Sequence, residues 1–300
     1  MKILTEASGS LTAGYIINSI QEANHEAIAS DITMECFAKY LADGFIKMPK
    51  ISEGNSWDKT IELIKENQVD IVLPTLDETL ILWAENKESL LRKDIHVIIS
   101  DQDIIEIFQD KWKTFLFFDK YEIPTPKTSL VQSYPLIKPR FGRGSKGIYE
   151  ASQTSKVEMK GKISQEIIKG VEYTVDVFCN SDGVPVYIVP RKRLQVREGK
   201  STGGIVVKHD LIEQYVKKIC SKVRFKGPIN IQCFEESNGN IQFIEINPRL
   251  AGGMALGFAA TENWINLIIN HFIDGQEIRP KEIKYGLKMM RYYHEVFMFE

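Results

Sequence analysis

The sequence has few cysteines and histidines, and they form no recognisable disulfide or metal pattern. Its 300 residues include 4 Cys and 5 His. Four cysteines in this length are too few for a disulfide scaffold, and they show no CxxC or other zinc spacing. The histidines are scattered along the chain. We therefore expect reduced, mostly buried thiols at Cys36, Cys179, Cys220 and Cys233, and no metal site built from His and Cys.

An excess of one charge and long hydrophobic runs are also absent. The 38 Lys and Arg residues nearly balance the 40 Asp and Glu residues, which gives a net charge of −2. A near-neutral chain offers no electrostatic reason to bind nucleic acid. No stretch approaches the roughly 18 apolar residues of a spanning helix, and the start has no long apolar targeting segment. We expect a cytoplasmic protein without nucleic-acid or membrane partners.

The first hundred residues alternate between strand and helix patterns. Strands separated by helices imply right-handed crossovers and a parallel sheet. We therefore predict an open parallel α/β unit. Its strands are expected at 2–5, 26–29, 70–74 and 96–99, and its helices at 13–23, 57–67 and 79–91.

Strand patterns become denser after residue 110, past the turn-rich segment 123–126. Asn238-Gly239 lies between two alternating apolar segments, which is a strong hairpin signal. The second part is therefore predicted to be an α+β unit of antiparallel sheets. Its strands are expected at 136–139, 147–151, 163–168, 172–179, 184–190, 204–207, 229–235 and 241–247, and its helices at 211–224 and 263–274.

A glycine-rich segment, GRGSKG at 142–147, follows a predicted strand that carries Lys138. It fits the GxGxxG pattern, but a dinucleotide site needs that pattern to open a helix, and the β-forming Ile148 and Tyr149 follow here. Glycines let backbone N–H groups approach phosphate oxygens closely, and Lys138 places a cation beside them. We predict a hairpin that covers phosphates; the alternative is a surface hairpin with solvated basic residues.

A group of polar residues lies on the segment IEINPR at 244–249. Side chains alternate along a strand, so Glu245 and Asn247 share one face while the two isoleucines face a core. Carboxylate and amide oxygens suit a hard cation such as Mg²⁺, and Gln232 on the preceding strand adds another oxygen. Arg249 is suited to hold a phosphoryl group or a substrate carboxylate. The alternative is a polar cluster at a strand end.

The segment SQEIIKGVEY at 164–173 offers a place for an adenine nucleoside. Backbone groups at a strand end can pair with an adenine edge, and Ile168 can contact the ring. Glu172 can accept hydrogen bonds from ribose hydroxyls. An ordinary strand–turn–strand is the alternative.

A basic cluster, RKRLQVR at 191–197, stands out in this near-neutral chain. Alternation places Arg191, Arg193, Gln195 and Arg197 on one strand face. One interpretation is a solvated edge strand. The other is a site for a second anion, either the acceptor carboxylate or the phosphates, with Arg193 and Arg197 as its substrate-binding residues.

These pieces, in this order, resemble the ATP-grasp superfamily, which includes biotin carboxylase, D-alanine–D-alanine ligase and the carbamoyl phosphate synthase large subunit. The most specific part is the joint occurrence of IKPRFGRGSKG, QEIIKGVEYTVDVF and IEINPR. Asp110-Lys111, followed by a helix and IPTP, matches the entry to the family's first lobe. The resemblance implies a biotin carboxylase-like N-terminal α/β domain at 1–109 and a two-lobed ATP-grasp domain at 110–300, with lobes at about 110–170 and 171–300.

The resemblance also implies roles for individual residues. Nucleotide phosphates would be held by Lys111 and Lys138 under a lid that includes Gly142, Gly144, Ser145 and Gly147. Adenine would contact Gln165, Glu166 and Ile168, and the ribose would contact Glu172. The Mg²⁺ ligands, with Mn²⁺ as an alternative ion, would be Gln232, Glu245 and Asn247; the catalytic residues would be Arg249 and Lys138.

One position departs from the family pattern. Gln232 stands where many relatives have a carboxylate, which resembles carbamoyl phosphate synthase-like members and removes a negative charge from the metal site. Glu235 cannot replace it, because three residues further on it faces the other side of a regular strand. The length of 300 residues leaves room for a single grasp unit, which disfavours carbamoyl phosphate synthesis itself.

The implied reaction joins a carboxylate to an amine with MgATP, through an acyl phosphate, and releases ADP and phosphate. Two alternatives stay open: a kinase that releases the acyl phosphate, and a non-catalytic ATP sensor of the same fold. The joint presence of Glu245, Asn247, Lys138 and Arg249 disfavours the sensor, while Gln232 favours it. The expected partners are small-molecule acids and amines, and a homodimer is compatible with the resemblance.

Overall fold

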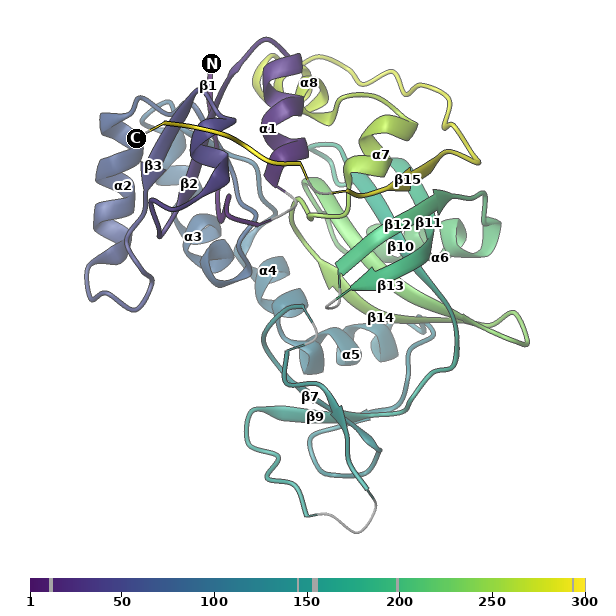
Figure 1. The fold of residues 1–300 in the computed structure, drawn as a ribbon. Coiled ribbons are helices and arrows are strands. Elements are labelled where there is room, and N and C mark those ends of the chain that lie inside the picture. The colour runs from purple at the N-terminus through teal and green to yellow at the C-terminus, as the bar shows by residue number, and fades with distance from the viewer. Residues whose placement is uncertain (11–12, 145, 153–155, 198–199, 293, 300) are drawn as a thin grey trace.

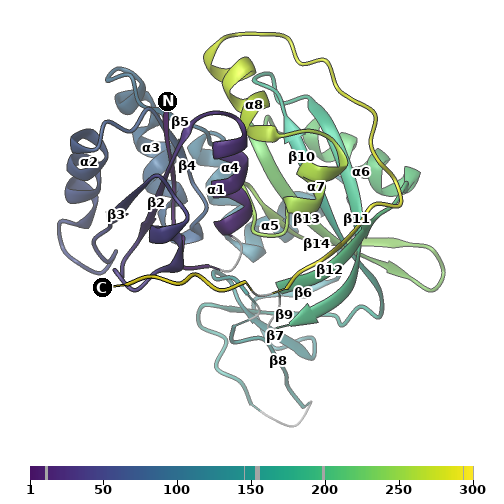
Figure 2. The same ribbon diagram turned by 45° about the horizontal axis from the view of Figure 1, so that its top comes forward.

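The computed structural model describes residues 1–300 apart from 11–12, 145, 153–155, 198–199, 293 and 300, with the side chains of 195–197, 200 and 201 also left aside. Figure 1 shows an N-terminal layer of helices and strands, a large twisted sheet beside it, and a small sheet that projects away from both. Figure 2 shows the same three parts from a second direction, with helix α1 between the N-terminal strands and the large sheet.

Five parallel strands form the N-terminal sheet, in the order β3-β2-β1-β4-β5. Helix α1 forms because apolar residues recur every three to four positions and bury one helix face. The predicted parallel α/β unit is confirmed. Its elements are β1 (Lys2–Thr5), α1 (Ala13–Glu22), β2 (Glu26–Asp31), η1 (Phe37–Tyr40), β3 (Gly44–Lys47), α2 (Ser56–Glu66), β4 (Ile71–Leu73), η2 (Asp77–Thr79), α3 (Leu80–Leu91) and β5 (His96–Val97).

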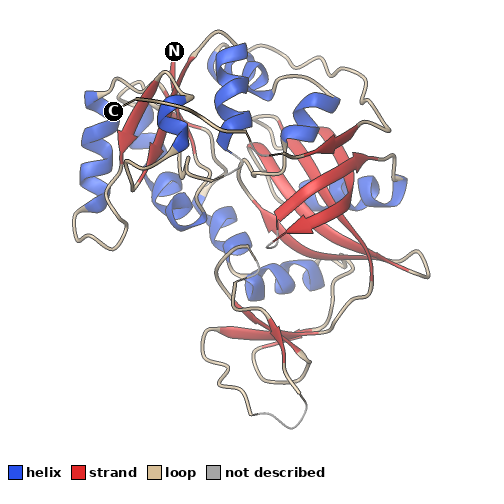
Figure 3. Ribbon diagram, in the orientation of Figure 1, coloured by secondary structure: helices blue, strands red, loops and turns tan. Residues whose placement is uncertain are grey.

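Two antiparallel sheets follow, as predicted: a six-stranded sheet in the order β14-β13-β10-β11-β12-β15, and a four-stranded sheet in the order β6-β9-β7-β8. Figure 3 shows helices on both sides of the larger sheet. The strands are β6 (Thr128–Ser129), β7 (Leu136–Pro139), β8 (Tyr149–Glu150), β9 (Lys162–Gln165), β10 (Gly170–Cys179), β11 (Pro185–Arg197), β12 (Lys200–Val206), β13 (Gly227–Glu236), β14 (Ile241–Asn247) and β15 (Lys288–Met290). The helices are α4 (Gln102–Gln109), α5 (Lys111–Lys120), α6 (Asp210–Cys220), α7 (Ala255–Ala260) and α8 (Trp264–Ile268), which continues as the π-helical turn η3 (Ile269–Ile273).

The large sheet is buried on both faces because its strands carry apolar side chains on each. Val175 and Val177 of β10 pack into one core with α4, α5 and α6. Phe178 of the same strand packs on the other face with Trp264 of α8, in a core that also holds α1. The N-terminal layer and the large sheet therefore share a continuous core, which fixes the walls of the space between them.

Strand β11 corrects one interpretation of the basic cluster at 191–197. It lies between β10 and β12, so a solvated edge strand is wrong. Its pairing with β12 is irregular between Arg193 and Gln195 and again between Gln195 and Val196. A bulge of this kind interrupts the strict alternation of side chains. The prediction that Arg191, Arg193, Gln195 and Arg197 share one face of the strand therefore no longer holds by alternation. The side chains of Gln195 and Arg197 lie outside the described residues.

The four cysteines are buried and unpaired, as predicted. No helix in the described part of the chain has the length and apolar character needed to cross a membrane.

Candidate active site

A cavity of about 1670 Å³ lies where the three sheets meet. Binding sites for one small molecule commonly measure about 300–1000 Å³, so this space has room for more than one substrate. The cavity is lined by most of the residues that the sequence singled out, namely Lys111, Lys138, Gly142, Gly144, Gln165, Glu166, Ile168, Glu172, Arg193, Gln232, Glu245, Asn247 and Arg249. Gly147 does not line it, and Ser145 and the side chain of Arg197 lie outside the described residues.

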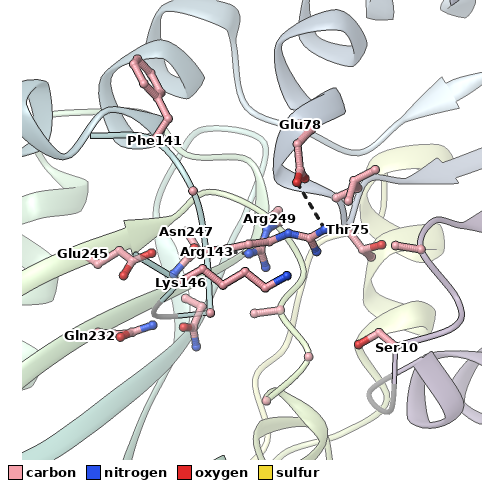
Figure 4. A pocket seen from close by; sticks show the side chains of 18 of the residues that line it. Ser10, Thr75, Glu78, Phe141, Arg143, Lys146, Gln232, Glu245, Asn247 and Arg249 are labelled. Carbon is pink, nitrogen blue, oxygen red and sulfur yellow. Dashed lines mark hydrogen bonds and ion pairs between the residues drawn. The ribbon is translucent and has the colours of Figure 1, made fainter. Parts of the chain in front are cut away.

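The proposed metal ligands come from two paired strands. Gln232 of β13 lies directly opposite Glu245 of β14, and Asn230 lies opposite Asn247. No hydrogen bond or ion pair among the described residues engages the Glu245 carboxylate or the side-chain amide of Gln232. Figure 4 shows Gln232, Glu245 and Asn247 grouped on one side of the cavity. One carboxylate and two amide oxygens form a donor set that suits Mg²⁺ with phosphate oxygens as further ligands.

Ile244 corrects the predicted alternation of strand β14. The register shifts there, because Gln232 pairs with Glu245 while the next residue, Cys233, pairs with Phe243. The extra residue between them lines the cavity instead of entering the core, whereas Ile246 is buried as predicted. A β-bulge re-aims the residues that follow it, and here it turns Glu245 towards the cavity.

Arg249 is held by a residue that the sequence analysis missed. Its Nε and Nη2 donate to the two carboxylate oxygens of Asp77, each at 2.7 Å. Asp77 opens η2, just after the carboxyl end of β4, and lies 172 residues away in the chain. Nη2 also donates to Asn247 Oδ1 at 3.3 Å. A bidentate pair of this kind fixes the guanidinium plane, so the N-terminal layer orients the arginine of the other part.

Lys138 is buried on β7, an inner strand of the small sheet. Its Nζ donates to Gln165 Oε1 at 2.6 Å, and Gln165 Nε2 donates in turn to Thr128 Oγ1 at 2.9 Å. Burial lowers the pKa of Lys138 to about 8; Glu245 opposes this shift, and Lys111 adds to it. Gln165 thus positions a lysine whose charge changes near neutral pH.

We expect nucleotide affinity to fall as the pH rises through the pKa of Lys138. Only the ammonium form attracts phosphate, and with a pKa of about 8 the dissociation constant of ADP should rise about tenfold between pH 7 and 9. Calorimetric titration across this range measures it. The variant Lys138→Arg keeps its charge throughout and should flatten the profile; an equally steep profile in that variant would assign the titration to another group.

The glycine segment forms the hairpin between β7 and β8, so a strand follows it, as predicted, and not the helix that a dinucleotide fingerprint opens. Gly142 and Gly144 have φ of +117° and +63°, a region that favours glycine. Lys111 Nζ donates to the Gly142 carbonyl at 2.9 Å. Arg143 lies 3.4 Å from Glu78 and 3.9 Å from Asp77, as Figure 4 shows in part, so the hairpin tip reaches the N-terminal layer.

The residues predicted to bind the ribose and the second anion, Glu172 and Arg193, are paired with each other. Arg193 of β11 forms an ion pair with Glu172 of the neighbouring β10. Arg191, which the sequence analysis grouped with Arg193, is fully buried and lies 2.6 Å from Asp176. The remaining two predicted residues, Glu166 and Ile168, lie on the linker after β9, where Glu166 accepts from the backbone of Lys127 at 3.0 Å. The predicted strand at 163–168 therefore ends earlier, at Gln165.

A small lobe with a glycine hairpin is set over a large antiparallel sheet with a shared cavity, and this arrangement is the ATP-grasp fold. Residues 158–294 match the family described as "ATP-grasp in the biosynthetic pathway with Ter operon", and residues 7–98 match "PylC-like, N-terminal domain". The chain therefore carries a PylC-like N-terminal domain followed by an ATP-grasp domain.

Relatives of known name support this assignment. The carbamoyl phosphate synthase large chain of Methanobrevibacter smithii is 25% identical over 247 residues, covering 67% of this chain and 22% of that protein. The corresponding Clostridium botulinum chain is 27% identical over 219 residues, covering 62% of this chain and 20% of that protein. The present chain is homologous to these large chains and spans about a fifth of their length.

Solved structures share the fold at low sequence identity. N5-carboxyaminoimidazole synthetase from Staphylococcus aureus, complexed with ADP, gives a TM-score of 0.75 at 16% identity, covering 97% of this chain and 82% of that one. The biotin carboxylase domain of Hydrogenobacter thermophilus 2-oxoglutarate carboxylase, with MgADP and bicarbonate, gives 0.73 at 15%, covering 96% and 73%. L-amino acid ligase from Bacillus licheniformis gives 0.69 at 16%, covering 94% and 74%.

Proposed function

We propose that this chain is an ATP-dependent ligase that activates a carboxylate as an acyl phosphate and joins it to an amine, releasing ADP and phosphate. The observation that carries the proposal is the cavity itself. It brings a buried lysine of the small sheet into one space with a carboxylate–amide cluster and an arginine of the large sheet, from segments about a hundred residues apart. The N-terminal layer supplies Asp77, which orients the arginine. Phosphoryl transfer needs this combination of positioning and charge neutralisation.

The nucleotide would lie along the small lobe. Its phosphates would contact Lys111, Lys138 and the glycine hairpin of Gly142 and Gly144, with Ser145 and Gly147 in the same lid. The adenine would lie against the linker of Glu166 and Ile168 after Gln165, and the ribose against Glu172. This arrangement also supports a division of the chain into 1–109 and 110–300, with lobes meeting near 170, because β9 ends and β10 begins on either side of that linker.

Mg²⁺, or Mn²⁺ in its place, would be held by Glu245, Gln232 and Asn247 and would neutralise charge on the phosphates. The fit rests on the donor chemistry and on the absence of a hydrogen-bond or ion-pair partner for Glu245 and Gln232 within the described residues. Because Gln232 is neutral, the cluster carries one negative charge fewer than a pair of carboxylates would give.

The two chemical steps require no nucleophilic side chain. A substrate carboxylate oxygen bonds to the γ-phosphorus as its bond to the bridging oxygen of ADP breaks. The amine nitrogen then bonds to the acyl carbon, the C–O bond to phosphate breaks, and the nitrogen loses a proton to give the amide. Lys138 would neutralise phosphate charge, and Arg249 would hold the transferred group or the oxyanion of the second step. Closure of the glycine hairpin would exclude water from the acyl phosphate.

ADP release with Mg²⁺ and a panel of acids and amines tests the proposal. Release that requires an acid and an amine together supports ligation. Release with an acid alone, with an acyl phosphate trapped by hydroxylamine, supports the carboxylate kinase. Binding of ATP without turnover across the panel supports the sensor, which the neutral Gln232 favours.

Replacing Arg193 by alanine should impair turnover more than folding. The substitution removes a charge from the cavity, and the loss of one charge-assisted contact corresponds to about a tenfold fall in kcat/KM. ADP release and thermal unfolding should be measured on Arg193→Ala and Arg197→Ala. Lys192→Ala is the matched control, because Lys192 lies beside Arg193 in the chain but is not among the residues that line the cavity. Unchanged kinetics in both arginine variants would remove this cluster from the active site.

A further inference from the structure

The cavity has an apolar wall on the side of the N-terminal sheet. Ile32 follows the carboxyl end of β2, and Met48, Pro49 and Ile51 follow the end of β3; all four line the cavity. Ile32 and Ile51 are 50% and 45% exposed, which leaves large apolar side chains open to the cavity. In open α/β sheets, ligands bind beyond the carboxyl ends of the strands, so these residues lie where a ligand is expected.

This wall has a rigid base. Trp57 of α2 also lines the cavity and packs edge-on against the buried Trp83, with ring centroids 4.8 Å apart. Trp83 Nε1 donates to Glu6 Oε1 at 2.8 Å, and Glu6 accepts a further hydrogen bond from Thr79 Oγ1 at 2.9 Å. An aromatic side chain fixed in this way offers preorganised apolar contact area.

The carboxylates near this wall are already engaged by protein groups. Glu6 is buried and bonded as described, Asp31 Oδ2 accepts from the Gly9 amide at 2.8 Å, and Glu78 pairs with Arg143. These carboxylates are therefore engaged already, and the side chains that the wall leaves to a ligand are apolar apart from Lys50, Ser56 and Thr60, which line the same cavity. The wall is continuous with the phosphate end of the same cavity, which Glu245 and Arg249 line.

We propose that this wall, formed by Ile32, Met48, Pro49, Ile51 and Trp57, binds a bulky alkyl or aromatic group of the carboxylate or amine substrate. The inference rests on the proposed function, since it places the apolar group in the same cavity as the reacting end. The cavity volume of about 1670 Å³ leaves space for such a substrate beside a nucleotide.

Saturation-transfer NMR on the full chain with MgADP tests the proposal. The probes are 4-phenylbutyrate and phenethylamine, with succinate and ethanolamine as polar counterparts, and the acid and amine arms show which substrate carries the apolar group. We expect an apolar probe to bind at least about tenfold more tightly than its polar counterpart. Equal binding of apolar and polar probes in both arms would overturn the proposal.

Substitutions in the wall provide a second test. The double variant Ile32→Ser/Ile51→Ser removes two half-exposed side chains, so the fold should survive, and the dissociation constant of the apolar probe should rise about tenfold or more. The matched control is Val184→Ser, which removes a 56% exposed valine away from the cavity. Unchanged probe binding in the double variant, or an equal loss in the control, would overturn the proposal.

The exposed Phe141 of the glycine hairpin is another group that could cover the wall, although it projects away from the polar cluster in Figure 4. In that case the double variant would weaken MgADP binding and leave probe selectivity unchanged, which would overturn the proposal.

Measurement of ADP release separates this inference from the proposed ligase function. Selective binding of apolar probes without any turnover would support the apolar binding site and contradict the proposed ligase activity. Turnover that occurs with polar substrates alone would support the ligase activity and contradict the apolar binding site.

Discussion

Replacing Glu245 by alanine is expected to lower Mg²⁺-dependent ADP release by about a thousandfold while leaving the fold intact. Glu245 supplies the only carboxylate of the proposed cluster with Gln232 and Asn247, and a metal ion that stabilises phosphoryl charge contributes several kcal/mol to the transition state. Its side chain enters no hydrogen bond or ion pair with the described residues, so no short contact is lost. Its charge does raise the pKa of the buried Lys138, and that pKa should therefore fall further in the variant. ADP release and thermal unfolding of the variant measure the two effects.

The facing strand provides a rescue experiment. Because Gln232 lies directly opposite Glu245, the change Gln232→Glu in the Glu245→Ala background returns a carboxylate to the same face. We expect it to recover part of the activity and to lower the Mg²⁺ concentration that gives half-maximal rate. The matched control is Glu236→Ala, whose carboxylate accepts from Gln242 at the far end of the strand pair and should leave the rate unchanged. Full activity in Glu245→Ala would contradict the metal assignment.

The residues that the sequence could indicate are those whose placement follows from local rules. Glu245 and Asn247 share a strand face with a facing Gln232, and the antiparallel pairing of β13 and β14 brings them together as the hairpin pattern predicts. Lys138 likewise precedes a glycine hairpin between two strands. Strand alternation and turn chemistry act over a few residues, so one sequence contains enough information to predict them.

The parts that the sequence did not indicate depend on packing between distant segments. Strand β3 was missed because it is a four-residue edge strand in which Ile46 alone is buried, so its pattern is weak. The bulge at Ile244 depends on register with β13, and the Arg193–Glu172 pair depends on which strands become neighbours. The weak signal for Asp77 was its position four residues beyond the carboxyl end of the buried strand β4, in a region where functional residues of parallel sheets gather.

Removing Asp77 should impair catalysis through Arg249. We expect Arg249→Ala to lower kcat by about a hundredfold to a thousandfold, because it would remove a donor to developing negative charge. Asp77→Ala keeps the guanidinium but removes the bidentate carboxylate that fixes its plane, and positioning partners of this kind commonly contribute about 10–100-fold. Asp77 acts through Arg249, so we expect its loss to lower kcat more than it raises the KM for ATP.

A double-mutant cycle separates positioning from simple loss of packing. If Asp77 acts through Arg249, the Asp77→Ala change should have little further effect on kcat in the Arg249→Ala background. The matched control is Asp101→Ala, since Asp101 also joins the N-terminal layer to the large sheet, through Lys226 at 3.3 Å, but does not line the cavity. That control should lower the melting temperature without changing kcat. Additive effects of Asp77 and Arg249 would show that Asp77 does not act through Arg249. An equal kcat loss in the control would show that the Asp77–Arg249 pair only holds the two parts together.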